Sequence, residues 1–227
     1  MSGLGMLALA SVAFVGTHFL MSHPLRSPMV SALGERGFAG VYSLISLLLF
    51  GWMIWAYPDA TAEAPQPYWD AGRWGYSFAT LLMWLGSVLF VGSLRRNPAL
   101  PRPGKVIERI DEPSGVYSIT RHPMMWGFAL WAVTHAIVNS TAASLILCSA
   151  IAFLALVGAA LQDGKKDRLM GQVWSDWRSK TSFVPYGRGL KSAGGFALTL
   201  GTILWLAATW AHGAFGGMPA GVWAFLG

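Results

Sequence analysis

Six long apolar stretches dominate the sequence and restrict what it can fold into. A transmembrane helix needs about 20 mainly apolar residues to cross a hydrocarbon layer of ~30 Å. Stretches that approach or reach this length lie at residues 4–21, 38–56, 75–94, 124–138, 141–161 and 194–212. The fourth is the shortest, and only Asn139 and Ser140 separate it from the fifth. The sequence therefore predicts an all-α, polytopic transmembrane helical bundle of about six spans.

The composition excludes a water-soluble protein. Only 11% of the 227 residues are charged, against roughly 25% in a typical soluble domain, and 54% are hydrophobic. Too few polar side chains remain to cover a water-facing surface, and the length leaves no room for a separate soluble module. We expect residues 1–227 to form one transmembrane domain. Its single cysteine, Cys148, lies in an apolar stretch and excludes an intramolecular disulfide.

The basic residues alternate between the two sides of the predicted bundle. Lys and Arg near helix ends favour the cytoplasmic side. The loops after the first, third and fifth stretches together hold 15 of them, and Arg73 stands alone among the other loops. Both termini are therefore expected to be non-cytoplasmic. The net charge of +6 is distributed between apolar stretches, which indicates contact with membrane lipid and not with nucleic acid.

Two of the predicted cytoplasmic segments are too long for simple connections, at residues 95–121 and 162–193. The first is rich in proline and ends in a charged cluster. In the second, charged residues alternate with Trp174, Trp177 and Phe183, a pattern that favours an amphipathic helix on the membrane surface.

Histidines within or beside membrane spans are candidates for function, because ionisable groups are costly in hydrocarbon. His18 and His122 lie at similar predicted depth on different helices, where two imidazoles suit the axial positions of a haem iron. A core histidine bonded to a backbone carbonyl is the alternative for His18. His135 and His212 belong near the opposite face, where we expect interfacial placement. His122 and His135 are about 20 Å apart along one helix and cannot share a compact site.

The tripeptide Arg121-His122-Pro123 precedes the fourth apolar stretch. Proline fits the first turn of a helix, so Arg121 and His122 are expected at a helix N-terminus, which favours a carboxylate or phosphate. Trp126 lies one turn further on and predicts an aromatic pocket wall. The alternative is that Arg121 pairs only with lipid phosphate.

Several motifs lie in different parts of the chain. Residues 117–127 read YSITRHPMMWG, and residues 181–186 read TSFVPY after Trp174 and Trp177. Near the N-terminus the chain has Thr17-His18 and the sequences GER at 34–36 and YSL at 42–44. Together these motifs resemble the NnrU family of bacterial membrane proteins. The resemblance covers roughly residues 14–186.

The resemblance implies an integral membrane protein of the bacterial inner membrane. Family members are named for genes associated with nitrite and nitric oxide reduction, and the family is similar to zeta-carotene isomerase, a membrane enzyme with histidine-ligated haem b. The implied function is haem b binding in support of denitrification or a redox-linked isomerisation. His18 and His122 match as metal ligands, and Arg121 and Trp126 complete the expected cofactor site. A membrane protein partner is also possible in this family, and whether the chain is an enzyme stays open.

Two other functions remain open at this point. The Arg-His-Pro element is also similar to one in membrane methyltransferases related to isoprenylcysteine carboxyl methyltransferase, where it helps to hold S-adenosylmethionine. Those enzymes carry a Glu-Glu pair where this chain reads Gln162-Asp163-Gly164-Lys165-Lys166-Asp167. Asp163 or Asp167 would then have to bind the ribose or the amino group. A non-catalytic assembly or maturation factor is the third possibility.

Overall fold

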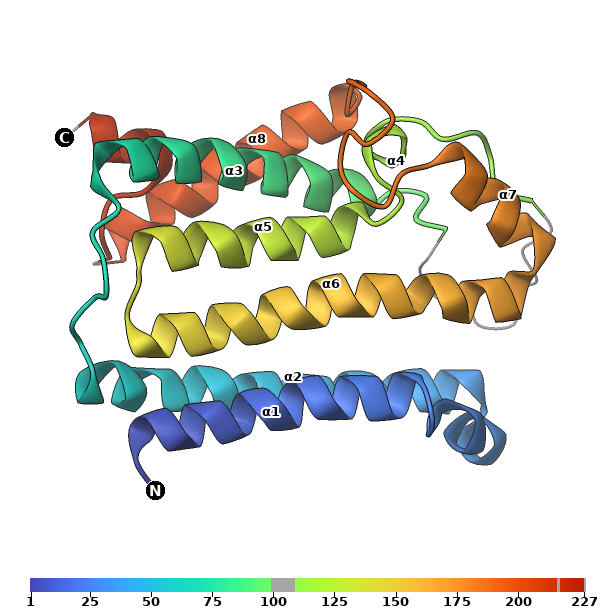
Figure 1. Ribbon diagram of the computed structural model, residues 1–227, viewed down its shortest axis with the longest axis horizontal. Coiled ribbons are helices and arrows are strands. Elements are labelled where there is room, and N and C mark those ends of the chain that lie inside the picture. The colour runs from blue at the N-terminus through green and yellow to red at the C-terminus, as the bar shows by residue number, and fades with distance from the viewer. Residues whose placement is uncertain (99–108, 216, 227) are drawn as a thin grey trace. The chain divides into compact units, whose positions relative to one another are not determined.

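The computed structural model describes residues 1–98, 109–215 and 217–226, and all regular secondary structure within these ranges is helical (Figure 1). The predicted all-α class is confirmed. In chain order the elements are α1 (Gly3–Ser22), α2 (Arg26–Glu63), α3 (Gly72–Ser93), α4 (Val116–Ile119), α5 (Pro123–Val138), α6 (Ala142–Met170), α7 (Gln172–Lys180), α8 (Gly195–Ala214) and the 3₁₀ helix η1 (Gly221–Phe225).

Each of the six predicted spans corresponds to one helix. α1, α2, α3, α6 and α8 are long and apolar enough to cross a membrane, and α5 is an apolar helix of 16 residues. α5 ends at Val138 and α6 begins at Ala142, so the connection at Asn139 and Ser140 is as short as expected. The side of the membrane on which the termini lie stays a prediction, and of the 15 basic residues used for it, Arg102 and Lys105 lie outside the described residues.

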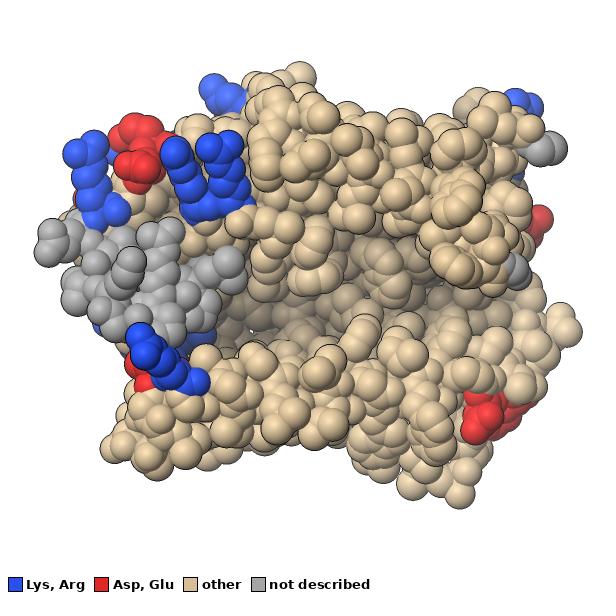
Figure 2. All heavy atoms as spheres, turned by 180° about the vertical axis from the view of Figure 1, so that it is seen from behind, with Lys and Arg blue, Asp and Glu red and all other residues tan. Residues whose placement is uncertain are grey.

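Large apolar side chains lie on the outside of these helices. Leu47, Trp55 and Trp74 are 67%, 68% and 87% exposed. On the face shown in Figure 2, the charged side chains gather toward the ends of the helices and the surface between them is uncharged. Exposed apolar surface of this extent is stable in contact with lipid and not with water. The chain is therefore an integral membrane protein.

Two helices differ in length from the predicted spans. α2 begins at Arg26, well before the apolar stretch, and its path breaks at Gly34, where φ is 70° and ψ is 168°. Arg26 and Glu35 form an ion pair of 2.9 Å across this break. α6 continues past its apolar part to Met170. It therefore carries Asp163 and Asp167 on a regular helix and not in a surface segment.

The described residues form two compact units. Unit 1 contains residues 1–70 and 139–154, in which α1 packs along α2. Unit 2 contains residues 71–98, 109–138, 155–215 and 217–226, in which α3 packs against both α5 and α8. The two ends of α6 belong to different units. The single domain predicted from the sequence stays a prediction.

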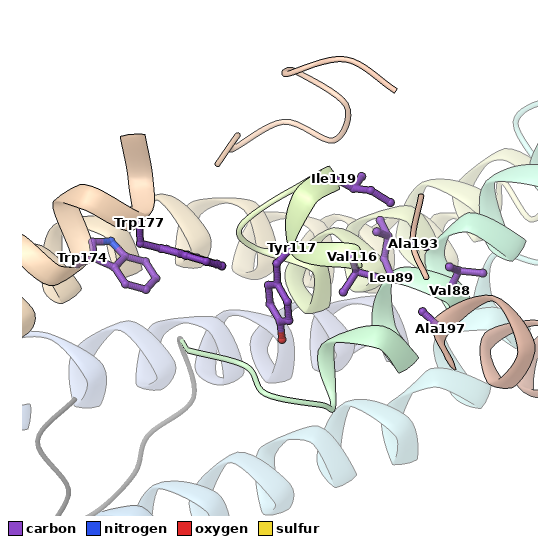
Figure 3. Close-up of a cluster of buried hydrophobic side chains, with 9 residues drawn as sticks. All are labelled: Val88, Leu89, Val116, Tyr117, Ile119, Trp174, Trp177, Ala193 and Ala197. Carbon is purple, nitrogen blue, oxygen red and sulfur yellow. The ribbon is translucent and has the colours of Figure 1, made fainter. Parts of the chain in front are cut away.

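A cluster of buried side chains joins the short helices of unit 2 (Figure 3). Trp174 and Trp177 of α7 are 0% and 4% exposed and pack with Tyr117 of α4 and with residues of α3 and α8. The Tyr117 hydroxyl donates to the carbonyl of Ser93 at 3.0 Å. The prediction that these two tryptophans belong to an amphipathic helix on the membrane surface is therefore wrong. Their indole rings are buried against α4 and are not available to the lipid interface.

The contact between α3 and α8 depends on a glycine. A Cβ atom at Gly201 of α8 would lie 2.6 Å from the Cα of Val88 on α3, closer than real Cβ contacts allow. Small residues of this kind let the backbones of membrane helices approach closely. At Gly195, in the same helix, a Cβ atom would meet no other group within 4 Å.

We predict that Gly201→Ala destabilises the protein, because the added methyl group forces α8 away from α3. Overpacking of this kind costs about 1–3 kcal/mol in the free energy of unfolding. Gly195→Ala, the matched control, should be neutral. Thermal unfolding of the purified variants in detergent measures both, and equal melting temperatures would contradict the proposed close contact.

Candidate functional site

The Arg-His-Pro element lies at the start of α5, as the sequence predicts. α4 ends at Ile119, Thr120 is extended with φ of −154° and ψ of 149°, and α5 begins at Pro123. The two residues between Thr120 and α5 are Arg121 and His122. Both are buried in unit 2. Proline at the first helical position has no N–H that would need a partner, which explains why the helix begins there.

The segment Ser182–Tyr186 holds this turn in place. The N–H of Arg121 donates to the carbonyl of Ser182 at 2.8 Å, and the N–H of Tyr186 donates to the carbonyl of Ile119 at 3.0 Å. The carbonyl of Phe183 accepts from the Thr120 hydroxyl at 2.6 Å and from the Trp126 indole at 2.8 Å. The two sequence motifs that are far apart in the chain therefore form one local structure.

A carboxylate from α6 binds both side chains of the element. Arg121 donates to Asp163 through Nε, at 3.1 Å from Oδ1 and 2.9 Å from Oδ2, and through Nη2, at 2.6 Å from Oδ2. His122 Nε2 lies 2.9 Å from Oδ1 of the same carboxylate. Asp163 is 6% exposed and Arg121 is 9% exposed. These three side chains are referred to below as the Arg–Asp–His cluster.

The cluster determines which nitrogen of the His122 ring carries the proton in the neutral form. A carboxylate accepts hydrogen bonds, so Nε2 of His122 carries the proton that is shared with Asp163. His122 is 2% exposed, and its Nδ1 has no hydrogen-bond partner among the described residues. The Phe183 ring stands edge-on to the imidazole, with the ring centres 5.4 Å apart. In the neutral ring, Nδ1 therefore keeps a lone pair in a buried position, and the Phe183 ring lies beside the imidazole.

His18 lies in unit 1 and has the complementary tautomer. Its Nδ1 donates to the carbonyl of Phe14 at 2.7 Å, one turn earlier in α1. The imidazole is partly buried between the rings of Phe14 and Tyr42, at 4.4 and 5.3 Å between centres. Nε2 of the neutral ring therefore carries the lone pair. Because His18 and His122 belong to different units, their sharing of one cofactor stays a prediction.

Sequence reasoning missed the pairing within the cluster. It placed Asp163 only as a partner for a bound ligand and assigned Arg121 to an anion or to lipid. An aspartate two residues beyond the end of an apolar stretch is itself a signal, because a carboxylate near the membrane boundary needs a cationic partner. Trp126 is partly buried and lies beside Phe183, and its role as the wall of a cofactor site stays a prediction.

A separate pocket of unit 2, of about 320 Å³, lies between α7 and the segment before α4. Lys180 and Glu112 form an ion pair at its edge. None of the predicted site residues lines it. Its lining residues are Arg109, Ile110, Asp111, Glu112, Val173, Asp176, Trp177 and Lys180.

The fold and the cluster together define a polytopic helical membrane protein with a buried, histidine-containing polar site at the start of one helix. The chain belongs to the NnrU family: the family model described as NnrU protein matches residues 6–220. No curated protein and no solved structure matches the chain. The resemblance to the NnrU family is confirmed, while the similarities to zeta-carotene isomerase and to the methyltransferases stay predictions.

We predict that Asp163→Ala strongly destabilises the protein. The change leaves the Arg121 guanidinium buried without a counter-charge and removes the acceptor of His122. Breaking a buried ion pair from one side costs about 3–5 kcal/mol.

The matched control is Asp167→Ala, one turn further along α6. Asp167 pairs with Arg178 at the surface, where its side chain is 34% exposed. Loss of an exposed pair costs about 0–1 kcal/mol. Denaturation in detergent compares the two variants, and an equal loss of stability would argue against a special role of the buried cluster.

Proposed function

We propose that this NnrU-family protein binds haem b in the bacterial inner membrane and supports denitrification or a redox-linked isomerisation. The single observation that carries the proposal is the Nδ1 atom of His122, which has no hydrogen-bond partner in the part of the chain that the structure describes. It lies on a buried ring whose other nitrogen is bound by a carboxylate. Bound haem would supply one-electron redox chemistry or an iron centre for ligand binding.

The tautomer and the hydrogen bond of His122 are those of a typical metal-binding histidine. Histidines that bind metals usually donate their other N–H to a carboxylate or a backbone carbonyl, which fixes the tautomer and raises the basicity of the free nitrogen. Asp163 is the carboxylate that accepts the N–H of His122. Arg121 in turn holds this carboxylate through Nε and Nη2. The role of Asp163 and Arg121 in this proposal is to orient the imidazole.

His18 also donates one ring N–H and leaves the other nitrogen unprotonated, but its acceptor is a backbone carbonyl and not a carboxylate. The carbonyl of Phe14 fixes the proton on Nδ1, and Nε2 remains as the ligand atom. We propose His18 and His122 as the two haem ligands and Trp126 as part of the apolar wall of the site.

The pairing within the cluster bears on the methyltransferase alternative. Binding of S-adenosylmethionine would use Arg121 for the carboxylate of the cofactor and an acidic residue for its cationic groups. In this structure Arg121 and Asp163 satisfy each other, so both would have to give up a buried ion pair. We therefore favour the haem proposal.

The proposal predicts a haem spectrum that depends on His122. Protein purified in mild detergent from haem-replete cells should show a Soret band, and the pyridine haemochrome should identify haem b. His122→Ala and His18→Ala should each lose most of this absorbance. His23→Ala, which removes a histidine outside the proposed site, should retain it.

Two results would overturn the proposal. One is colourless protein from haem-replete cells. The other is a His122→Ala variant that melts at a lower temperature but keeps the full spectrum, which would make His122 a structural residue. Calorimetry with S-adenosylmethionine, and co-purification with a membrane reductase, then test the two alternatives. A strain that carries only the His122→Ala variant shows whether the same site supports growth on nitrite.

A further inference from the structure

Two histidines that the proposed haem site does not use lie close together in unit 2. His135 belongs to the last turn of α5 and His212 to the last turn of α8. Their ring centres are 6.2 Å apart, with an angle of 35° between the planes. His135 is partly buried and His212 is exposed on the surface of unit 2.

Both rings have the same tautomer, and each helix fixes it locally. Nδ1 of His135 donates to the carbonyl of Trp131 at 2.7 Å, and Nδ1 of His212 donates to the carbonyl of Ala208 at 2.8 Å. A carbonyl cannot donate, so the proton of each neutral imidazole is on Nδ1. The lone pair of each ring is therefore on Nε2, the nitrogen that points away from the backbone bond.

The separation of the rings suits a shared metal ion. With a metal–nitrogen bond of ~2.0–2.1 Å, a bound ion lies about 3.2 Å from the centre of the ring. Two imidazoles on one ion thus have centres from about 5.2 Å apart in tetrahedral geometry to about 6.4 Å in linear geometry. The observed 6.2 Å lies within this range, so the separation of the rings matches that of two imidazoles on one ion.

The surroundings also favour a cation. Both histidines lie at helix C-termini, where the helix dipole attracts positive charge. The indole of Trp131 stacks on the His135 ring with 4.1 Å between the ring centres, which restricts the orientation of the imidazole. Within the described ranges no third His, Cys, Asp or Glu joins the pair. Water or an external ligand would complete the coordination.

We propose that His135 and His212 form a two-histidine site for a first-row divalent cation such as Cu²⁺ or Zn²⁺. Imidazole nitrogen is a preferred ligand of both ions, and Cu²⁺ binds most tightly in the divalent series. The site is open, unlike a closed structural zinc site with four protein ligands. It is separate from the proposed haem site, because His135 lies at the opposite end of α5 from His122.

Titration with Cu²⁺ of tag-free protein in detergent tests the site. The wild-type protein should bind one equivalent in this site, and electron paramagnetic resonance of the complex should report two imidazole nitrogens. His212→Ala and His135→Ala should each weaken the affinity at least 10-fold, and the double variant should abolish binding there. His23→Ala should leave the affinity unchanged.

The exposed position of His212 makes His212→Ala the safer variant, because its loss removes no buried contact. Its melting temperature without metal should equal that of the wild type. Unchanged Cu²⁺ affinity in His212→Ala, or a resonance spectrum with fewer than two imidazoles in the wild type, would overturn the proposal. Either result would mean that His135 and His212 do not share the ion and that Cu²⁺ is bound as an adventitious ion only.

Discussion

The buried carboxylate of Asp163 is the interaction on which the functional end of unit 2 depends. It accepts from the guanidinium of Arg121 and from the ring of His122, and so ties the start of α5 to α6. A buried aspartate alone would be too costly, and a buried arginine alone equally so. Together the two charges compensate each other. Oδ1 of Asp163 also accepts the hydrogen bond that holds the His122 ring. The same element is bound on its other side by Ser182 and Phe183, so every group around His122 has a defined position.

The long helices follow from the sequence because membrane hydrocarbon accepts only apolar segments of sufficient length with internally bonded backbones. The beginning of α5 also follows, since Arg121-His122-Pro123 combines a first-turn proline with a change from polar to apolar residues. Trp174 and Trp177 show the limit of such reasoning. An amphipathic pattern has the same appearance whether its apolar face meets lipid or protein, and only the presence of Tyr117 and α4 decides that these rings are buried.

The candidate site was less predictable than the fold. Four residues of the candidate site were identifiable from the sequence, because residues of their types stand in unusual places: His18, Arg121, His122 and Trp126. Their partners were not, because Asp163 and Phe183 are about 40 and 60 residues away in the chain and no local pattern connects them to His122. Backbone carbonyls such as those of Phe14 and Phe183 leave no trace in a sequence, although they decide which nitrogen of a ring is protonated and where an indole points.

The histidines of this chain differ in how much of the chain must fold before the tautomer of the ring is fixed. His18, His135 and His212 obtain their tautomer from a carbonyl four residues earlier, so a single turn of helix is enough to prepare each of them. His122 requires Asp163 and the segment around Phe183, both of which are synthesised after it. During biogenesis, the environment of His122 is therefore completed only after the ribosome has passed Tyr186 and the part of α6 that carries Asp163 has reached the start of α5. The surroundings of His122 thus depend on α6 and on the segment after α7, whereas one helical turn is sufficient for each of the other three histidines.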